Sequence, residues 1–370
     1  MARRLRVGIV GGGVIVQGQH LPNLLFLKDE LEVVGVADPS AKARAFIESR
    51  FGVPTFASGD DLRDRGRLDA ILVASPDFTH AREVLASLER GLHVFCEKPL
   101  CYGVEEADAV VAARDRAGKV VQLGYMKRHD PSYEACLDLL PEDGRGLRYV
   151  SVEVNDPDAW PFMEPHPYVQ GDDVPADLIA DGRPLQRAQI ERALGGPVPD
   201  PIARGFATAY CSALVHDVNL VHGMLDRMGV PAGEVVGAQL FAGGDGGLGT
   251  VRLLGGRAVW QMTHLTVPRL ADYRERVTVY LDDRIVELLF PSPWLNHHPT
   301  RLVEKRSDGL TLSTREIRPG FGEAFVRELQ AFHASATEGA PVRNTPEQAR
   351  RDQALLCGLA RHAAQSAAGT

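Results

Sequence analysis

A lysine held between a glutamate and a proline is the feature of this chain with the clearest chemical meaning. It lies in the run Cys96-Glu97-Lys98-Pro99-Leu100. Proline restricts the preceding residue to extended backbone conformations, so covalent geometry as well as packing sets the direction of the Lys98 side chain. A partly desolvated lysine near another positive charge loses its proton more easily, which suits it to hydrogen-bond or deprotonate a hydroxyl group. The pattern therefore indicates acid–base chemistry at Lys98.

A glycine-rich turn near the N-terminus could bind the phosphates of a dinucleotide. Gly11-Gly12-Gly13 follows the apolar stretch Leu5–Val10 and leads into Val14 and Ile15. Gly11 permits a tight turn, and Gly13 lets backbone N–H groups approach a pyrophosphate at the N-terminus of the next helix. Val16 replaces the third glycine of the usual pattern, so the triplet is informative only together with its surroundings. We expect the backbone from Gly11 to Ile15 to contact the dinucleotide.

An aspartate at the end of the second apolar stretch indicates which dinucleotide is bound. Asp38 closes the stretch Leu31–Ala37, where a carboxylate can accept hydrogen bonds from both hydroxyls of a ribose. The same charge repels a 2′-phosphate, and Pro39 follows where a phosphate-binding arginine would be useful. The sequence therefore predicts NAD in preference to NADP.

The elements that position these residues change character once along the chain. Up to about residue 125, short apolar stretches alternate with amphipathic helices, which is typical of βαβ units and a parallel sheet. The predicted strands there are Leu5–Val10, Leu31–Ala37, Ala70–Ala74, His93–Cys96 and Lys119–Leu123, with helices at Ala41–Arg50, Asp77–Arg90 and Val104–Ala117. From residue 147 onward we predict strands at Leu147–Val154, Glu234–Phe241, Gly247–Leu254, Arg257–Thr266, Tyr273–Leu281 and Arg284–Phe290, with helices at Ser212–Met228, Phe321–Glu338 and Pro346–Ala368.

The fold class predicted from these patterns is α/β with two domains. Residues 1–125 form a doubly wound parallel sheet, and residues 126–370 form an α/β domain with a large open, mostly antiparallel sheet. An irregular, proline-rich insertion occupies about 156–207, with one helical stretch near Leu185–Leu194. It carries Trp160, Phe162 and Tyr168, and aromatic residues are atypical of disordered linkers. We therefore expect an ordered insertion that shapes the substrate site.

Composition narrows the classes of partner. The chain has 370 residues and a net charge of −8, which argues against nucleic acid or an anionic membrane as the main partner. Its five cysteines are scattered and never form a Cys-x-x-Cys pair, so neither a disulfide framework nor a zinc site is favoured. The basic N-terminus lacks a cleavable signal, and no apolar run is long enough to cross a bilayer. We expect a cytoplasmic protein without a metal.

Taken together, the motifs resemble those of the Gfo/Idh/MocA family, the glucose-fructose oxidoreductase and inositol dehydrogenase group. They are Gly11-Gly12-Gly13 with His20-Leu21-Pro22, Ala37-Asp38, Ser75-Pro76 with His80, Glu97-Lys98-Pro99, Gly124-Tyr125-Met126-Lys127-Arg128 before Pro131, and Phe325, Glu328, Leu329 and Phe332 before Pro341. The resemblance implies a Rossmann domain and a second domain whose open sheet makes a homodimer or homotetramer. It also implies hydride transfer between NAD(P) and a hydroxyl carbon of a sugar or cyclitol. Lys98 would be in the active site, and Ser75, Pro76, His80 and Glu97 would join the cofactor-binding residues.

The resemblance allows two alignments for the acid–base residue. Family members place an aspartate and a histidine one helical turn apart, and the preferred counterparts are Ser212 and His216, whose spacing of four puts them on one helix face. A second alignment puts Asp217 in the aspartate position, but Val221 then replaces the histidine. Histidine titrates near neutral pH, which supports His216 as the base.

The sequence therefore predicts an NAD-dependent oxidoreductase acting on a sugar, cyclitol or glycoside. His216 would accept the hydroxyl proton and Lys98 would polarise that oxygen, while Tyr125, Arg128 and Ser212 would contact substrate. Two alternatives stay open: a redox-neutral enzyme that oxidises, eliminates and re-reduces a sugar on tightly bound NAD, and a non-catalytic NAD-binding sensor. The identity of the sugar, the reacting carbon and the direction of the reaction stay open too.

Overall fold

The computed structural model describes residues 3–157 and 159–368, and the chain divides into two compact units. The first unit combines the N-terminal part up to Met126 with His166–Ala193 and Phe325–Arg351. The second combines Lys127–Pro165, Leu194–Ala324 and the part from Asp352 onward. The chain thus passes repeatedly between the units, whereas sequence periodicity predicts a single boundary between residues 125 and 126.

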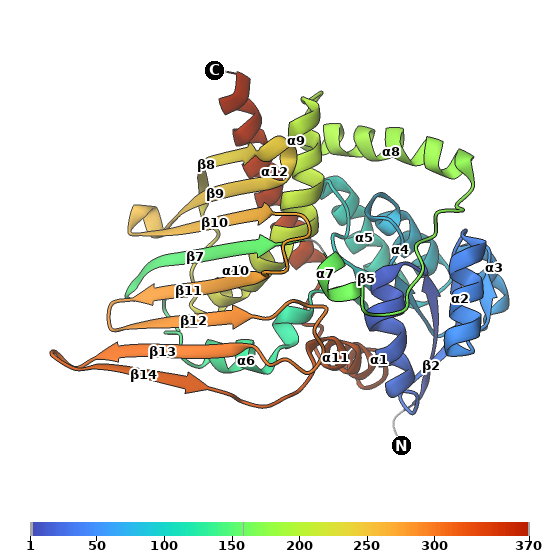
Figure 1. The fold of residues 1–370 in the computed structure, drawn as a ribbon, viewed down its shortest axis with the longest axis horizontal. Helices are drawn as coiled ribbons and strands as arrows, with labels where there is room; N and C mark the ends of the chain where they lie inside the picture. The colour runs from blue at the N-terminus through green and yellow to red at the C-terminus, as the bar shows by residue number, and fades with distance from the viewer. Residues whose placement is uncertain (1–2, 158, 369–370) are drawn as a thin grey trace. The chain divides into compact units, whose positions relative to one another are not determined.

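The first unit contains a six-stranded sheet in which every pair of neighbouring strands is parallel. Its order is β3-β2-β1-β4-β5-β6, so the direction of winding reverses between β1 and β4. Figure 1 labels β2 and β5 of this sheet. The strands are β1 (Leu5–Val10), β2 (Leu31–Ala37), β3 (Thr55–Phe56), β4 (Ala70–Val73), β5 (His93–Glu97) and β6 (Val121–Gly124). This is the strand order of a dinucleotide-binding doubly wound fold, in which ligands bind beyond the carboxyl ends of the strands at the reversal point.

The helices of the first unit come from three separate parts of the chain. They are the π-helix η1 (Val16–His20), α1 (Leu21–Phe26), α2 (Ala41–Phe51), α3 (Gly59–Arg65), the 3₁₀-helix η2 (Asp77–Thr79), α4 (His80–Glu89), α5 (Val104–Ala117), α8 (Ala176–Leu194) and α11 (Ala324–Glu338). The late helix α11 closes the core, because Leu329 and Phe332 are buried in the same cluster as Leu5 and Ile9. The rings of Phe95 and Phe332 meet edge to face with centroids 5.9 Å apart.

The second unit contains an eight-stranded sheet of order β14-β13-β12-β11-β7-β10-β9-β8. Only the central pair β7 and β10 is parallel, and the other neighbouring pairs are antiparallel. Its strands are β7 (Leu147–Asp156), β8 (Glu234–Phe241), β9 (Gly246–Leu253), β10 (Ala258–Thr266), β11 (Arg274–Leu281), β12 (Arg284–Phe290), β13 (Arg301–Ser307) and β14 (Leu312–Ile317). This sheet confirms the prediction of a large, mostly antiparallel one.

The remaining helical elements are mostly in the second unit. They are the 3₁₀-helix η3 (Met126–His129), α6 (Pro131–Leu137), α7 (Trp160–Met163), α9 (Asp200–Gly205), the π-helix η4 (Phe206–Leu214), α10 (Val215–Arg227), the 3₁₀-helices η5 (Ala242–Gly244) and η6 (Leu254–Gly256), and α12 (Pro346–Ala368). Side chains of η4, α10 and α12 cover one face of the sheet: a Cβ on Gly249 of β9 would lie 2.7 Å from the Leu359 side chain of α12.

The proline-rich segment expected to be irregular holds three helices, α7, α8 and α9. The sequence predicts a helix only near Leu185–Leu194, since a proline such as Pro184 usually breaks a helix. In the structure Pro184 lies inside the 19-residue helix α8. Most of this segment, His166–Ala193, is part of the first unit.

Candidate active site

The turn after β1 has the geometry needed to hold a phosphate group. Gly11 has φ +99°, and a Cβ there would lie 2.3 Å from the carbonyl oxygen of Ala74, so no other residue fits. A Cβ on Gly13 would meet nothing within 4 Å, which shows open space beside the turn. The helical conformation begins at Val14 and Ile15, whose N–H groups belong to the first helical turn and lack intrahelical acceptors. These donors fit an anionic pyrophosphate.

Asp38 is fixed beside this turn by two backbone donors. The N–H group of Gly12 donates to Oδ2 over 2.7 Å, and the N–H group of Ser40 donates to Oδ1 over 2.8 Å. A carboxylate has about four acceptor positions, so lone pairs are left for a ribose diol. The Arg44 guanidinium donates to the carbonyl oxygens of Asp38 at 2.7 Å and Pro39 at 3.0 Å. A basic residue therefore does lie at this corner, five positions after Pro39, where the sequence analysis noted that an arginine was missing.

His80 links the turns that follow β4 and β5. It is 1% exposed, with Nδ1 2.7 Å from the carbonyl oxygen of Pro99 and Nε2 2.6 Å from that of Ser75. Both ring nitrogens therefore contact protein, so the ring can position Ser75 and Pro76 for a cofactor but does not itself offer a free nitrogen. The Ser75 hydroxyl also lies 2.6 Å from that of Thr79.

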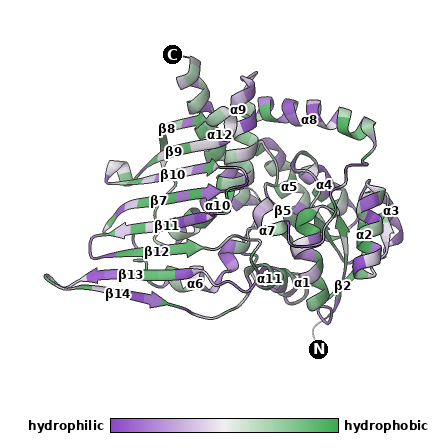
Figure 2. Ribbon diagram, viewed as in Figure 1, coloured by the Kyte–Doolittle hydropathy of each residue, from purple (hydrophilic) through white to green (hydrophobic). Residues whose placement is uncertain are grey.

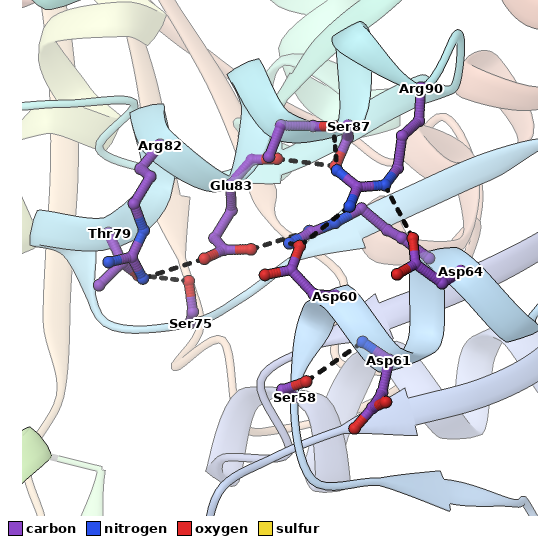
Figure 3. A network of polar contacts seen from close by, with 12 residues as sticks. Ser58, Asp60, Asp61, Asp64, Ser75, Thr79, Arg82, Glu83, Ser87 and Arg90 are labelled. Carbon is purple, nitrogen blue, oxygen red and sulfur yellow. Dashed lines mark hydrogen bonds and ion pairs between the residues drawn. The ribbon is translucent and has the colours of Figure 1, made fainter.

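A network of ion pairs and hydrogen bonds connects α3 with α4 and with Arg90 directly after it (Figure 3). Arg63 is buried and bonds both Glu83, at 2.8 Å, and Asp60, at 3.0 Å. Arg90 reaches Asp60 at 3.3 Å and Asp64 at 3.2 Å. The network holds α4 in place, and α4 begins at His80.

Lys98 lies directly after β5, at the carboxyl end of the sheet. The Lys98–Pro99 peptide bond is cis, and the Lys98 side chain is half-buried. Glu97 Oε2 accepts the N–H of Lys98 over 3.1 Å, and Oε1 lies 2.6 Å from His20 Nε2. Burial opposes ionisation, but the His20 hydrogen bond and the charges of His20 and Lys98 outweigh it and lower the pKa of Glu97. Glu97 is therefore an anion that fixes the backbone of Lys98.

In the second unit, the helix expected at Ser212–Met228 has two parts. Ser212 is exposed in the π-helix η4, and His216 is half-buried in the first turn of α10. π-Helical turns often occur at functional sites because they rotate the side chains that follow. Asp217, the alternative candidate, is 1% exposed and points into the unit.

Asp217 belongs to a buried cluster that the sequence reading did not identify. The ammonium group of Lys127 lies 3.6 Å from Asp217 Oδ1 and contacts Glu275, which also accepts a hydrogen bond from the Tyr273 hydroxyl. Burial lowers the pKa of Lys127, but the two carboxylates raise it further and keep the group charged. Burial and the Glu275 charge raise the pKa of Asp217 well above its usual range. The cluster anchors the turn that carries His216.

Two predicted substrate residues lie in the interiors of their units. Tyr125, in the first unit, is 2% exposed, and its carbonyl oxygen accepts a hydrogen bond from Asn344. Arg128, in the second, is 8% exposed and donates to the carbonyl oxygen of Asn219 on α10 at 3.2 Å. His264 on β10 is also buried, and burial lowers its pKa to about 4, so the ring is neutral at physiological pH.

The first unit thus gathers one set of predicted residues at the carboxyl ends of its strands. They are Gly11, Gly12, Gly13, Val14, Ile15, Asp38, Ser75, Pro76, His80, Glu97 and Lys98. The second unit places Ser212, His216 and Arg128 on or against η4 and α10. Within residues 3–157 and 159–368, no group of three or more His, Cys, Asp or Glu side chains could hold a metal ion. Within the same residues, no helix is long and apolar enough to cross a membrane.

The open space at Gly13, the helix N-terminus beside it and the fixed carboxylate of Asp38 together fit a nicotinamide dinucleotide. Residues 5–125 match the model of the Gfo/Idh/MocA family, described as an oxidoreductase family with an NAD-binding Rossmann fold. This match covers the dinucleotide-binding part of the chain, so residues 5–125 resemble the Rossmann domain of these oxidoreductases.

Curated relatives match part of the chain. Inositol 2-dehydrogenase 3 of Saccharopolyspora erythraea is 39% identical over 143 residues, which is 38% of this chain and 42% of the relative. Inositol 2-dehydrogenase of Rubrobacter xylanophilus is 39% identical over 146 residues, 39% of this chain and 42% of the relative. The chain thus aligns with about two fifths of these relatives' length.

Solved structures match nearly the whole chain at low identity. A 3-ketoreductase from Actinomadura kijaniata, in complex with NADP and TDP-benzene, has a TM-score of 0.71 at 19% identity and covers 96% of both chains. UDP-N-acetylglucosamine 3-dehydrogenase from Acidithiobacillus ferrooxidans has a TM-score of 0.69 at 18% identity, covering 98% of this chain and 99% of that one. These similarities confirm the two-part fold.

Proposed function

We propose that this protein is an NAD-dependent dehydrogenase acting on a CH–OH group of a sugar, cyclitol or glycoside. The observation that carries the proposal is the position of Lys98, at the carboxyl end of β5 in a unit whose glycine turn and Asp38 fit a dinucleotide. The family, the inositol dehydrogenases among the relatives and the ketoreductase among the structural neighbours support it.

The chemistry assigned to the chain is proton handling at the substrate oxygen. When bound, the nicotinamide accepts a hydride from the substrate carbon or returns one to it. Lys98 holds and polarises the oxygen on that carbon, and Glu97 fixes its backbone. His216 accepts the hydroxyl proton during oxidation and returns it during reduction, a role suited to a side chain that titrates near neutral pH.

The direct test is a panel of sugars, cyclitols and glycosides assayed for NADH formation, followed by substitution of Lys98. Lys98→Ala should lower kcat by about 100-fold or more with little change in NAD affinity, as expected for a positioned acid–base group. Lys28→Ala, which removes an exposed lysine of the same unit, is the matched control. Near-normal turnover by Lys98→Ala on a confirmed substrate would remove Lys98 from the mechanism.

A redox-neutral enzyme that retains its NAD is a second candidate, favoured by one observation. The segment His166–Ala193 runs across the loops at the carboxyl edge of the parallel sheet, which would slow exchange of a cofactor beneath it. Product formation without net NADH would identify this candidate. Tight NAD binding without turnover of any substrate would instead favour a sensor.

We propose further that the protein prefers NAD to NADP, because Asp38 faces the site of the ribose. We also propose that it is a cytoplasmic homodimer or homotetramer assembled through the eight-stranded sheet. On the face of that sheet opposite the helices, the rings of Tyr149 and exposed Tyr280 lie 5.6 Å apart.

A further inference from the structure

The segment His166–Ala193 is attached to the cofactor-binding edge of the first unit along its length. At its start, Gln17 Nε2 donates to the carbonyl oxygen of Val169 at 2.9 Å, and the Val169 N–H donates back to Gln17 Oε1 at 2.8 Å. Further along, α8 contacts the turns after β4 and β5: Gln189 donates to the carbonyl oxygen of Phe78 at 3.0 Å. Gln186 donates to the Tyr102 hydroxyl at 2.8 Å.

Between these attachments the segment passes over the corner between β2 and α2. This corner combines several groups that suit a phosphate: the Ser40 hydroxyl, the N–H and ammonium groups of Lys42, and the Arg44 guanidinium. It is also the N-terminus of α2, an 11-residue helix, where the helix dipole favours an anion. In a doubly wound fold the 2′-position of the adenine ribose lies beside this corner, next to Asp38.

Two carboxylates of the segment already fill the corner. Asp173 accepts hydrogen bonds from the Ser40 hydroxyl and, at 3.0 Å, from the Lys42 N–H. Asp172 pairs with the Lys42 ammonium at 2.6 Å. The Ser40 hydrogen bond lowers the pKa of Asp173, and the hydrogen bond and charge of Asp172 raise the pKa of Lys42, so Asp173 and Lys42 are both charged near neutral pH.

We propose that Asp173, assisted by Asp172, is a specificity-determining residue that excludes NADP, because its carboxylate occupies the place and the donors that a 2′-phosphate would use. This inference rests on the proposed NAD-dependent function. Asp38 discriminates through its bonds to the ribose hydroxyls, whereas Asp173 discriminates by holding an anion where the phosphate would be. The two residues come from parts of the chain more than a hundred positions apart in sequence.

Both aspartates are exposed, and exposed ion pairs contribute little to stability by themselves. Their positions depend on the other attachments of the segment, chiefly the paired bonds between Gln17 and Val169. A carboxylate held in this way changes the stability of the fold little, and it still repels a phosphate dianion at short range.

The experiment measures dissociation constants of NAD and NADP by calorimetry, so that no substrate is needed. Asp173→Asn keeps the size of the side chain and removes its charge. It should tighten NADP binding relative to NAD by about tenfold, the scale of one charge-assisted contact. Asp172→Asn keeps Asp173 in place and frees the Lys42 charge, so it should give a smaller shift in the same direction. Asp181→Asn, an exposed aspartate on α8, is the matched control and should leave the ratio unchanged.

The possible outcomes separate this inference from the proposed function. If the wild-type protein binds NAD and the Asp173→Asn ratio equals that of the control, the inference is wrong and the proposed function stands. An equal loss of affinity for both cofactors, or a wild-type preference for NADP, overturns it as well. If the wild-type protein binds neither cofactor, both proposals fall.

Discussion

Replacing one buried carboxyl group should change the stability of the first unit in a pH-dependent way. Glu328 lies on α11 and is fully buried, and neither of its carboxyl oxygens has a hydrogen-bond partner in the part of the chain that the structure describes. Burial, and then the charge of Glu97, raise the pKa of Glu328 well above its usual range. The folded protein therefore keeps this group as a neutral acid, while the unfolded chain releases the proton near pH 4.3, the ordinary value for glutamate.

The sign follows from the number of protons bound in each state. Above the unfolded-state pKa, the folded state holds one proton more than the unfolded state, so the free energy of unfolding falls as pH rises. One proton corresponds to about 1.4 kcal/mol for each pH unit over this range. Glu328→Gln has nearly the same shape and cannot ionise. It should gain about 1.4 kcal/mol relative to wild type between pH 5 and pH 6.

The assay is denaturant unfolding of wild type and Glu328→Gln at pH 5, 6 and 7, because all other titrating groups cancel in the difference. Glu338→Gln, an exposed position at the end of the same helix, should show no such trend. A stability difference that does not change with pH would show that Glu328 binds its proton equally in both states, and the reasoning from burial would fail.

Three further predictions concern the site and the assembly. Asp38→Arg should weaken NAD binding by about tenfold or more and ease NADP binding, since a charge-assisted hydrogen bond is lost; unchanged dissociation constants would refute the assignment. His216→Ala should abolish the neutral limb of the pH–rate profile, and Ser212→Asp should move that limb to higher pH because a nearby carboxylate favours the imidazolium; a profile unaltered in both variants would place the base elsewhere. Tyr280→Arg should reduce the assembled mass in light scattering, since a charge on the open sheet face opposes association; an unchanged oligomer would show that another surface is used.

Much of the fold could be predicted because its signals are local. The apolar stretches of β1, β2, β8 and β12 agree residue for residue with the strands observed. β13 and β14 were missed because hydrophilic residues occupy most of their positions (Figure 2). No residue of β14 is buried, so it also lacks an alternation of buried and exposed positions. Such an edge strand is specified by its hydrogen bonds to β13 rather than by burial.

Candidate site residues could be predicted only where a chemically suitable residue directly follows a predicted strand. The glycine turn, Asp38 and Lys98 each follow a strand of the parallel sheet, so their shared edge could be foreseen. The acidic partners of Lys127 could not be predicted, because Asp217 and Glu275 come from elements distant in the sequence. A buried charged residue also leaves no periodic pattern in the sequence. Asp172 and Asp173 were missed for a different reason: the segment carrying them was expected to shape the substrate site, whereas its contacts are with the cofactor-binding unit.

The position of α11 in the chain has a consequence for how the protein is made. Leu329 and Phe332 complete the core around β1 and β5, yet the ribosome adds them about two hundred residues after β6. Since synthesis proceeds at about 5–20 residues per second, the apolar surface around Phe95 stays uncovered for about 10–40 s after β6 has been made. The nascent dinucleotide-binding unit is therefore a natural client for chaperones during synthesis. A fragment ending at Met126 would keep that surface exposed permanently.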